Sequence, residues 1–194
     1  MASPTLALPA AGGVKPRGVL LQATLFVVCS GTMLFGTLLA AYLHMRRLGH
    51  PFPPNGTKID QYWGNVMAGT MVMSALTVEW GCSSLRRGER KQALAAFGIT
   101  VGLGLAFLNL LSFSSGHVKF DAVTNPYGLV VAALVMGLGI AVGIGVAFVA
   151  LTLARVAGRQ LLEADAEQPR AAAIYWHFVS AVAVAVWYTV IVLK

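Results

Sequence analysis

Five long apolar runs dominate this sequence, and each is about as long as a lipid bilayer is thick. They lie at about 18–43, 62–83, 92–113, 127–154 and 172–193. A helix needs about 20 predominantly apolar residues to cross the hydrocarbon core of a membrane. Because a lipid-exposed span must satisfy its backbone hydrogen bonds internally, each run is expected to be helical. The sequence therefore predicts an all-α, polytopic membrane protein built as a five-transmembrane-helix bundle.

The charged residues are few and lie mostly between the apolar runs. Only 11% of the chain is charged, against about a quarter in soluble domains. A net charge of +7 would suggest nucleic acid as a partner of a soluble protein. Here we expect the Lys and Arg residues to set membrane orientation, with no nucleic-acid partner. Residues 1–17 are expected to form a short N-terminal cytoplasmic tail, and residues 18–194 a single five-helix transmembrane domain.

The distribution of basic residues predicts the orientation. Five crossings place the two termini on opposite sides of the membrane. Of the 14 Lys and Arg residues, nine fall on the side of the N-terminus and five on the other. The nine are Lys15, Arg17, Arg86, Arg87, Arg90, Lys91, Arg155, Arg159 and Arg170. Because cytoplasmic loops carry the excess of Lys and Arg, we expect the N-terminus in the cytoplasm and the C-terminus outside.

Ionisable residues are scarce within the apolar runs. Glu79 is the only acid in one of them, and it precedes the basic turn that contains Arg86 and Arg87. We expect Glu79 to form an ion pair with one of these arginines near the membrane surface. A proton-handling role is the alternative, since intramembrane ionisable residues often mark function. His177 is the only histidine within a run, so we predict no catalytic residue in this chain.

No pattern of metal ligands is present. His44, His50 and His117 lie outside the predicted spans on the outer side, and their spacing matches no familiar ligand set. Cys29 and Cys82 form no CxxC motif, and are expected to be buried small apolar residues. The sequence therefore predicts no metal or redox cofactor in this chain. A membrane enzyme with its own metal is the alternative that the histidine count disfavours.

Glycines recur at helical spacing in the third and fourth runs. Gly98 and Gly102 stand four residues apart, as do Gly139 and Gly143. Small residues at this spacing allow helix backbones to approach closely in lipid. We therefore expect these glycines to pack against neighbouring helices.

Three segments together resemble a known family. The last run contains YWHFV (175–179), which resembles the last-helix motif of cytochrome c oxidase subunit III. CSGTMLFGTLLAAYLHMR (29–46) is similar to the first helix of the short, five-helix bacterial form of that family. SALTVEWGCSSLRRGERKQALAAFGITVGLGLAFL (74–108) is similar to its second and third helices and the basic turn between them.

The chain departs from the family pattern at several polar positions. Gly31 stands where the family usually carries an acid, and Ser180 where an aspartate usually follows YWHFV. Met136 and Gly139 replace the two histidines of the fourth helix, and SFS (112–114) stands near the place of an aromatic-acid-aromatic triplet. Each change removes a polar group from the membrane interior. The chain is identified as a divergent member of the family.

The resemblance implies a function. In the family this subunit binds no redox cofactor, packs beside the catalytic subunit and binds phospholipid. We therefore expect a non-catalytic accessory subunit of a haem-copper terminal oxidase in aerobic respiratory electron transfer, in the bacterial cytoplasmic membrane. The expected partners are oxidase subunits I and II, which would hold haem and copper. Phospholipid is a further expected partner, and a larger respiratory supercomplex is another candidate. A quinol oxidase or nitric oxide reductase complex is one alternative, and a small membrane transporter is another.

Seven residues receive expected contacts with lipid or with another subunit. Tyr175 and Trp176 are expected near a membrane interface, where amphipathic rings are favoured. His177 is expected to hydrogen-bond a neighbouring helix or a lipid headgroup, and Glu79 to lie at the interface. The remaining three residues are arginines, whose guanidinium groups suit phosphate. They are expected to hold lipid phosphates, or only to set the orientation of the chain in the membrane: Arg86, Arg87 and Arg90.

Overall fold

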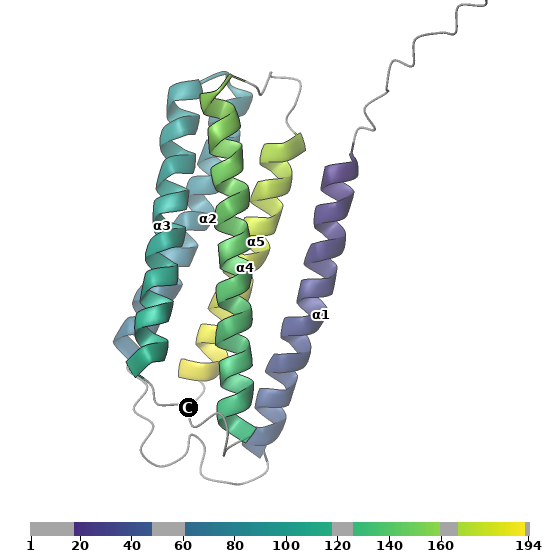
Figure 1. The fold of residues 1–194 in the computed structure, drawn as a ribbon, viewed down its shortest axis with the longest axis vertical. Coiled ribbons are helices and arrows are strands. Elements are labelled where there is room, and N and C mark those ends of the chain that lie inside the picture. Colours follow the sequence, from purple (N-terminus) through teal and green to yellow (C-terminus); the bar gives the residue numbers. More distant parts are fainter. Residues whose placement is uncertain (1–17, 48–60, 118–125, 160–166, 193–194) are drawn as a thin grey trace, which may run out of the picture.

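The chain folds into a bundle of long helices (Figure 1). The structure is a computed structural model, and it describes residues 18–47, 61–117, 126–159 and 167–192. The helices are α1 (Val19–Arg47), α2 (Gln61–Arg86), α3 (Arg90–His117), α4 (Pro126–Ala157) and α5 (Glu167–Trp187), which continues into the short π-helix η1 (Tyr188–Val192). The predicted all-α membrane bundle is confirmed. The predicted tail, 1–17, lies outside the described residues.

Each expected span falls on one of these helices. Among the described residues, α1, α3, α4 and α5 are long and apolar enough to cross a membrane, by length and composition. The chain is thus a multi-pass membrane protein. Helix α2 has 26 residues and is the least apolar of the five. It nevertheless runs alongside the others over a similar length (Figure 1).

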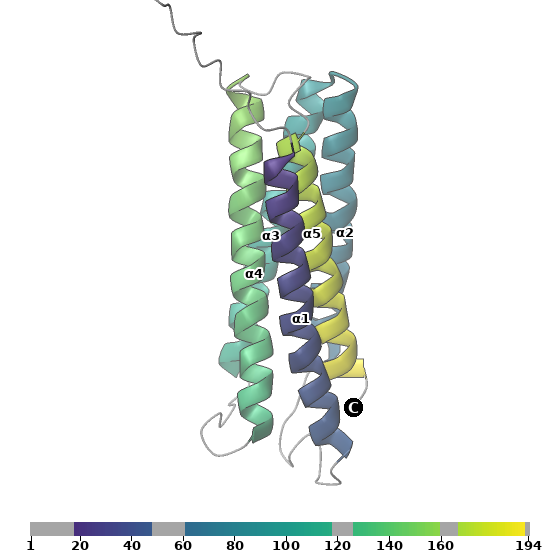
Figure 2. The same ribbon diagram turned by 90° about the vertical axis from the view of Figure 1, so that its right-hand side faces the viewer.

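The last helix lies at the centre of the bundle. Helix α5 packs against α1, α2 and α4, and α3 packs between α2 and α4. Helix α1 packs on α5 and α4 and stands apart from α3 (Figures 1 and 2). A larger share of α5 is buried than of any other membrane-length helix. Its side chains therefore supply much of the packing between the helices.

The glycines that pack closely differ from those that the spacing indicated. A Cβ atom at Gly104 would lie 2.7 Å from the Trp176 ring, and one at Gly145 would lie 3.0 Å from it. At Gly98 and Gly102 such an atom would meet nothing within 4 Å. The expected close packing at these two positions is therefore wrong for this bundle. Gly139 is in ordinary contact with Leu111, and its partner Gly143, like Gly98 and Gly102, meets nothing.

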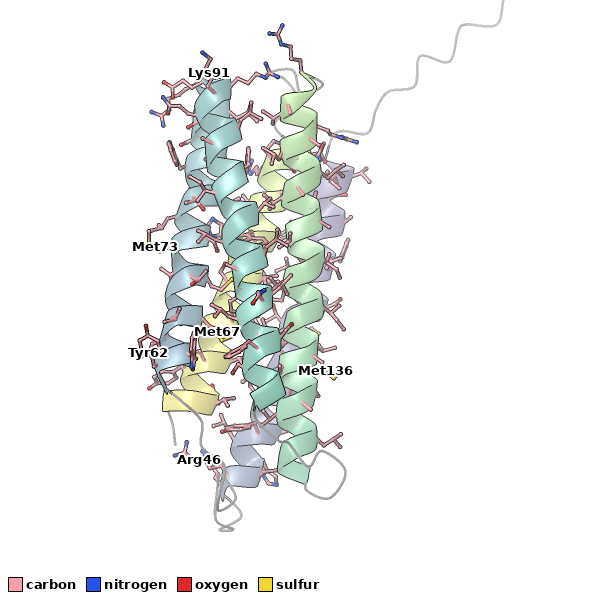
Figure 3. All side chains as sticks on the ribbon, turned by 60° about the vertical axis from the view of Figure 1, so that its left-hand side comes forward. Arg46, Tyr62, Met67, Met73, Lys91 and Met136 are labelled. Atoms are coloured by element: carbon pink, nitrogen blue, oxygen red, sulfur yellow. The ribbon has the colours of Figure 1, made fainter. Side chains whose placement is uncertain are left out.

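Basic residues gather at one end of the bundle. Helices α2 and α4 end there and α3 and α5 begin there, so Lys91 lies at the opposite end from Arg46 (Figure 3). In the described part of the chain this end has seven Lys and Arg residues, and the other end has Arg46 and Arg47. The seven are Arg86, Arg87, Arg90, Lys91, Arg155, Arg159 and Arg170.

Candidate functional site

The tripeptide Tyr175–Trp176–His177 brings together most of the residues that the sequence singled out. Successive residues of a helix point about 100° apart, so three consecutive side chains of α5 reach three different neighbours. Trp176 points into the bundle, Tyr175 reaches α4, and His177 reaches the outer side of α2. The motif therefore joins α5 to the helices around it.

Trp176 is the largest fully buried side chain. Its indole Nε1 donates a hydrogen bond to Ser74 Oγ of α2 at 3.0 Å. Its ring occupies the space left by two glycines, Gly104 of α3 and Gly145 of α4. One side chain thus contacts three helices at once, and the polar atom that would be costly to bury alone is paired.

Tyr175 joins α5 to α4. Its hydroxyl donates to the backbone carbonyl oxygen of Ala141 at 3.0 Å, and its ring lies near the rings of Phe148 and Phe178. The tyrosine is 6% exposed. We expected Tyr175 and Trp176 near a membrane interface. The structure buries both rings in the helix packing, where each polar atom has a partner on another helix, and their depth in the membrane stays a prediction.

Glu79 lies between a histidine and an arginine on the outside of the bundle. Its Oε1 is 3.4 Å from Arg86 Nη2, and its Oε2 is 3.5 Å from His177 Nε2. The predicted ion pair with Arg86 is confirmed. The contact with His177 joins two of the sequence-predicted residues, and the sequence did not indicate it. The three side chains are about half exposed, at 62% for Arg86, 54% for Glu79 and 46% for His177.

The other two arginines have different surroundings. Arg90 donates from Nε to the carbonyl oxygen of Val156 at 3.0 Å and from Nη2 to that of Ala157. These are terminal carbonyls of α4, which lack partners within their own helix. Arg90 therefore ties the start of α3 to the end of α4. Arg87, the residue after the end of α2, donates to the carbonyl and hydroxyl oxygens of Ser83 on that helix.

Two polar contacts between helices at the basic end could not be predicted from the sequence. The carboxylate of Glu167 accepts hydrogen bonds from the backbone N–H groups of Leu20 and Leu21, at 2.9 and 3.2 Å. It therefore caps α1 from the start of α5, where an acid is favourable. Arg155 donates to Gln168 at 2.6 Å. Glu167 precedes the apolar run that was expected at 172–193, and nothing in the sequence indicates that its partner is another helix.

Three positions that depart from the family pattern have different surroundings. A Cβ atom at Gly31 would lie 2.6 Å from the end of the Phe178 ring, so a larger residue requires that ring to move. Ser180 is buried, and its hydroxyl has no hydrogen-bond partner among the described residues. Met136 is 69% exposed on α4, on the side away from α2 (Figure 3).

The polar groups of the described residues mostly connect helices. No three His, Cys, Asp or Glu side chains gather there as a metal site would require. His44 is exposed near the end of α1. His50 lies outside the described residues, as does the side chain of His117.

Comparison with known proteins gives one family. The sequence model of "Cytochrome c oxidase subunit III" matches residues 13–193. Among curated proteins, cytochrome c oxidase subunit 3 of Cyprinus carpio is 32% identical over 137 residues, which cover 70% of this chain and 52% of the relative. The proteins of the same name from Danio rerio and Strongylocentrotus purpuratus are 33% and 30% identical over the same length, with 52% and 53% of the relative covered. The chain thus spans about half the length of the curated relatives it matches.

Proposed function

This chain belongs to the cytochrome c oxidase subunit III family, and on that premise we propose that it is a non-catalytic accessory subunit of a haem-copper oxidase in aerobic respiration. The observation that carries the proposal is the bonding of the YWH motif. The polar atoms of Trp176 and Tyr175 form hydrogen bonds with α2 and α4. A motif that holds four helices together in this way has a structural role.

The proposed partners are oxidase subunits I and II, with haem and copper bound in those partners. Helix α1 supports this assignment, because it contacts the bundle through α5 and α4 and exposes large side chains elsewhere. Phe26 is 73% exposed and Met33 is 75% exposed. A helix with so little of its surface buried has ample apolar area for a neighbouring subunit or for lipid.

Phospholipid is proposed at the basic end. Arg86 and Arg87 are exposed, and each arginine has five N–H donors, of which only some are used. Arg90 is less suited to a phosphate, because its Nε and Nη2 atoms bond α4. The proposed phosphate contacts are therefore those of Arg86 and Arg87.

The proposed location is a bacterial cytoplasmic membrane, with the N-terminus in the cytoplasm and the C-terminus outside. The seven basic residues at one end of the bundle support this orientation, since Lys and Arg accumulate on the cytoplasmic side.

Purification from native membranes in mild detergent tests the proposed function. We expect a tagged chain to co-purify with a large subunit that shows haem absorbance. The donor that reduces this haem, cytochrome c or quinol, then identifies the type of complex. Isolation of the chain as a lone oligomer that mediates solute flux in liposomes would instead establish a transporter.

A further inference from the structure

The Glu79–His177 pair lies on the outer surface at a depth where lipid chains are expected. Arg86, at the end of α2, follows Glu79 by seven residues, or about 10 Å along a helix. His177 lies about 15 Å along α5 from its first residue, Glu167. The 21 residues of α5 and the 5 of η1 extend about 39 Å, longer than a hydrocarbon core of about 30 Å. The pair therefore lies below the level of the headgroups.

Hydrocarbon is a poor environment for these two side chains. Intramembrane ionisable residues are costly and almost always face protein or water. Here Glu79 and His177 are half exposed to the surroundings of the bundle. Their mutual distance of 3.5 Å and the 3.4 Å from Glu79 to Arg86 are long for charge-assisted hydrogen bonds. The contacts within the chain therefore leave the carboxylate incompletely paired.

The lone pairs of the Glu79 carboxylate that lack a close donor indicate what kind of group would bind there. An ionised carboxylate only accepts hydrogen bonds and offers about four lone-pair sites. Arg86 and His177 each lie near a different carboxylate oxygen of Glu79, at the long distances of 3.4 and 3.5 Å. The missing group is thus a hydrogen-bond donor. A phospholipid phosphate is an acceptor and is anionic, so it does not complement Glu79.

The surface beside the pair suits a helix. Leu76 precedes Glu79 by three residues and Val72 by seven, so both share its face of α2. Leu76 is 62% exposed and Val72 is 49% exposed. A helix lying along this face would contact both apolar side chains and reach Glu79 at the same time.

We propose that the face of α2 and α5 that carries Glu79 and His177 is the docking surface for a membrane-spanning helix of a partner oxidase subunit, which donates a hydrogen bond to Glu79. The proposal rests on the proposed function, because that function supplies the partner. It adds which face of the bundle the partner covers and which side chain meets it.

Photo-crosslinking in native membranes tests this surface. A photoreactive amino acid is placed at Leu76, beside the pair, and at Met136, which is 69% exposed on α4 and points away from α2 (Figure 3). We expect the Leu76 probe to capture an oxidase subunit and the Met136 probe to capture none. The proposal is overturned if the intact complex co-purifies while the Leu76 probe captures only lipid or a second copy of this chain. Failure to co-purify any haem subunit would instead contradict the proposed function.

A pair of variants then tests the hydrogen bond. Interhelical hydrogen bonds in membranes contribute about 0.6 to 1.7 kcal/mol, so Glu79→Leu should lower the Leu76 crosslink by about threefold to eighteenfold. His177→Ala should lower it too, with the haem spectrum of the remaining complex unchanged. The control is Asn109→Leu, which removes another exposed polar side chain, on α3, and should leave the crosslink intact. An equal yield in Glu79→Leu and Asn109→Leu would contradict the role of Glu79.

Discussion

Trp176 shows how a single side chain can organise a membrane bundle. Within lipid, burial of apolar surface gives little advantage, so helices associate through packing and interhelical hydrogen bonds. Trp176 supplies both, because its ring fills the space at Gly104 and Gly145 while its Nε1 bonds Ser74. Another interhelical hydrogen bond joins α2 to α3, between the hydroxyl groups of Thr77 and Thr100, whose oxygens are 2.9 Å apart.

Removal of the Ser74 hydroxyl should weaken the contact between α2 and α5. We expect Ser74→Ala to lower the free energy of unfolding by about 0.6 to 1.7 kcal/mol, since it leaves the Trp176 N–H unpaired. The measurement is a denaturant titration of the purified protein in detergent. Ser83→Ala is the control, because the Ser83 hydroxyl donates to Trp80 of its own helix and should change stability little. Equal losses in both variants would show that the interhelical bond contributes nothing.

At the scale of the elements, glycines determine how closely the helices approach. The α2–α3 turn contains Gly88, whose φ of +74° is a left-handed conformation that favours glycine. Within α3, Gly104 faces the core, whereas Gly102 faces away from its neighbours. Two glycines on one helix thus serve different purposes.

Addition of a methyl group at these two positions should have opposite outcomes. Gly104→Ala places a Cβ atom 2.6 Å from Val146 and 2.7 Å from Trp176, and should destabilise the protein by about 1 to 3 kcal/mol through overpacking. Gly102→Ala meets open space and should leave stability unchanged or raise it by up to about 1 kcal/mol, because alanine favours helix. Thermal unfolding in detergent compares them, and a Gly104→Ala variant as stable as Gly102→Ala would show that α3 shifts freely.

At the scale of the whole molecule, the bundle has one strongly basic end that is also tied together. Arg90 bonds the end of α4, Arg155 bonds Gln168 of α5, and Glu167 caps α1. Four helices are therefore connected at the end where positive charge gathers. The positive charge favours placing this end at the cytoplasmic surface.

Cysteine labelling from the two sides of the membrane tests the orientation. Single cysteines replace Lys91 or Arg46, which lie at opposite ends (Figure 3), in a chain whose Cys29 and Cys82 are changed to alanine. A membrane-impermeant maleimide added to intact cells, after permeabilisation of any outer envelope, should label the Arg46→Cys variant and spare Lys91→Cys. Inverted vesicles should show the reverse. The opposite pattern would place the basic end outside.

The candidate site was accessible to sequence analysis only in part. The motif at Tyr175, Trp176 and His177 could be recognised, and the pairing of Glu79 with Arg86 could be predicted because both lie on one helix, two turns apart. The contact of Glu79 with His177 could not, since it depends on how α2 and α5 are rotated against each other. The same holds for Glu167, whose partners are on α1.

The sequence by itself determined that the chain is a helical membrane protein, where its apolar runs lie and at which end its basic residues gather. Only the tertiary structure decided which face of each helix points inward. The physical reason is that lipid and the bundle interior are both apolar, so hydrophobic periodicity does not distinguish them. Gly102 and Gly104 illustrate this, because only the packing of Trp176 makes one of them necessary.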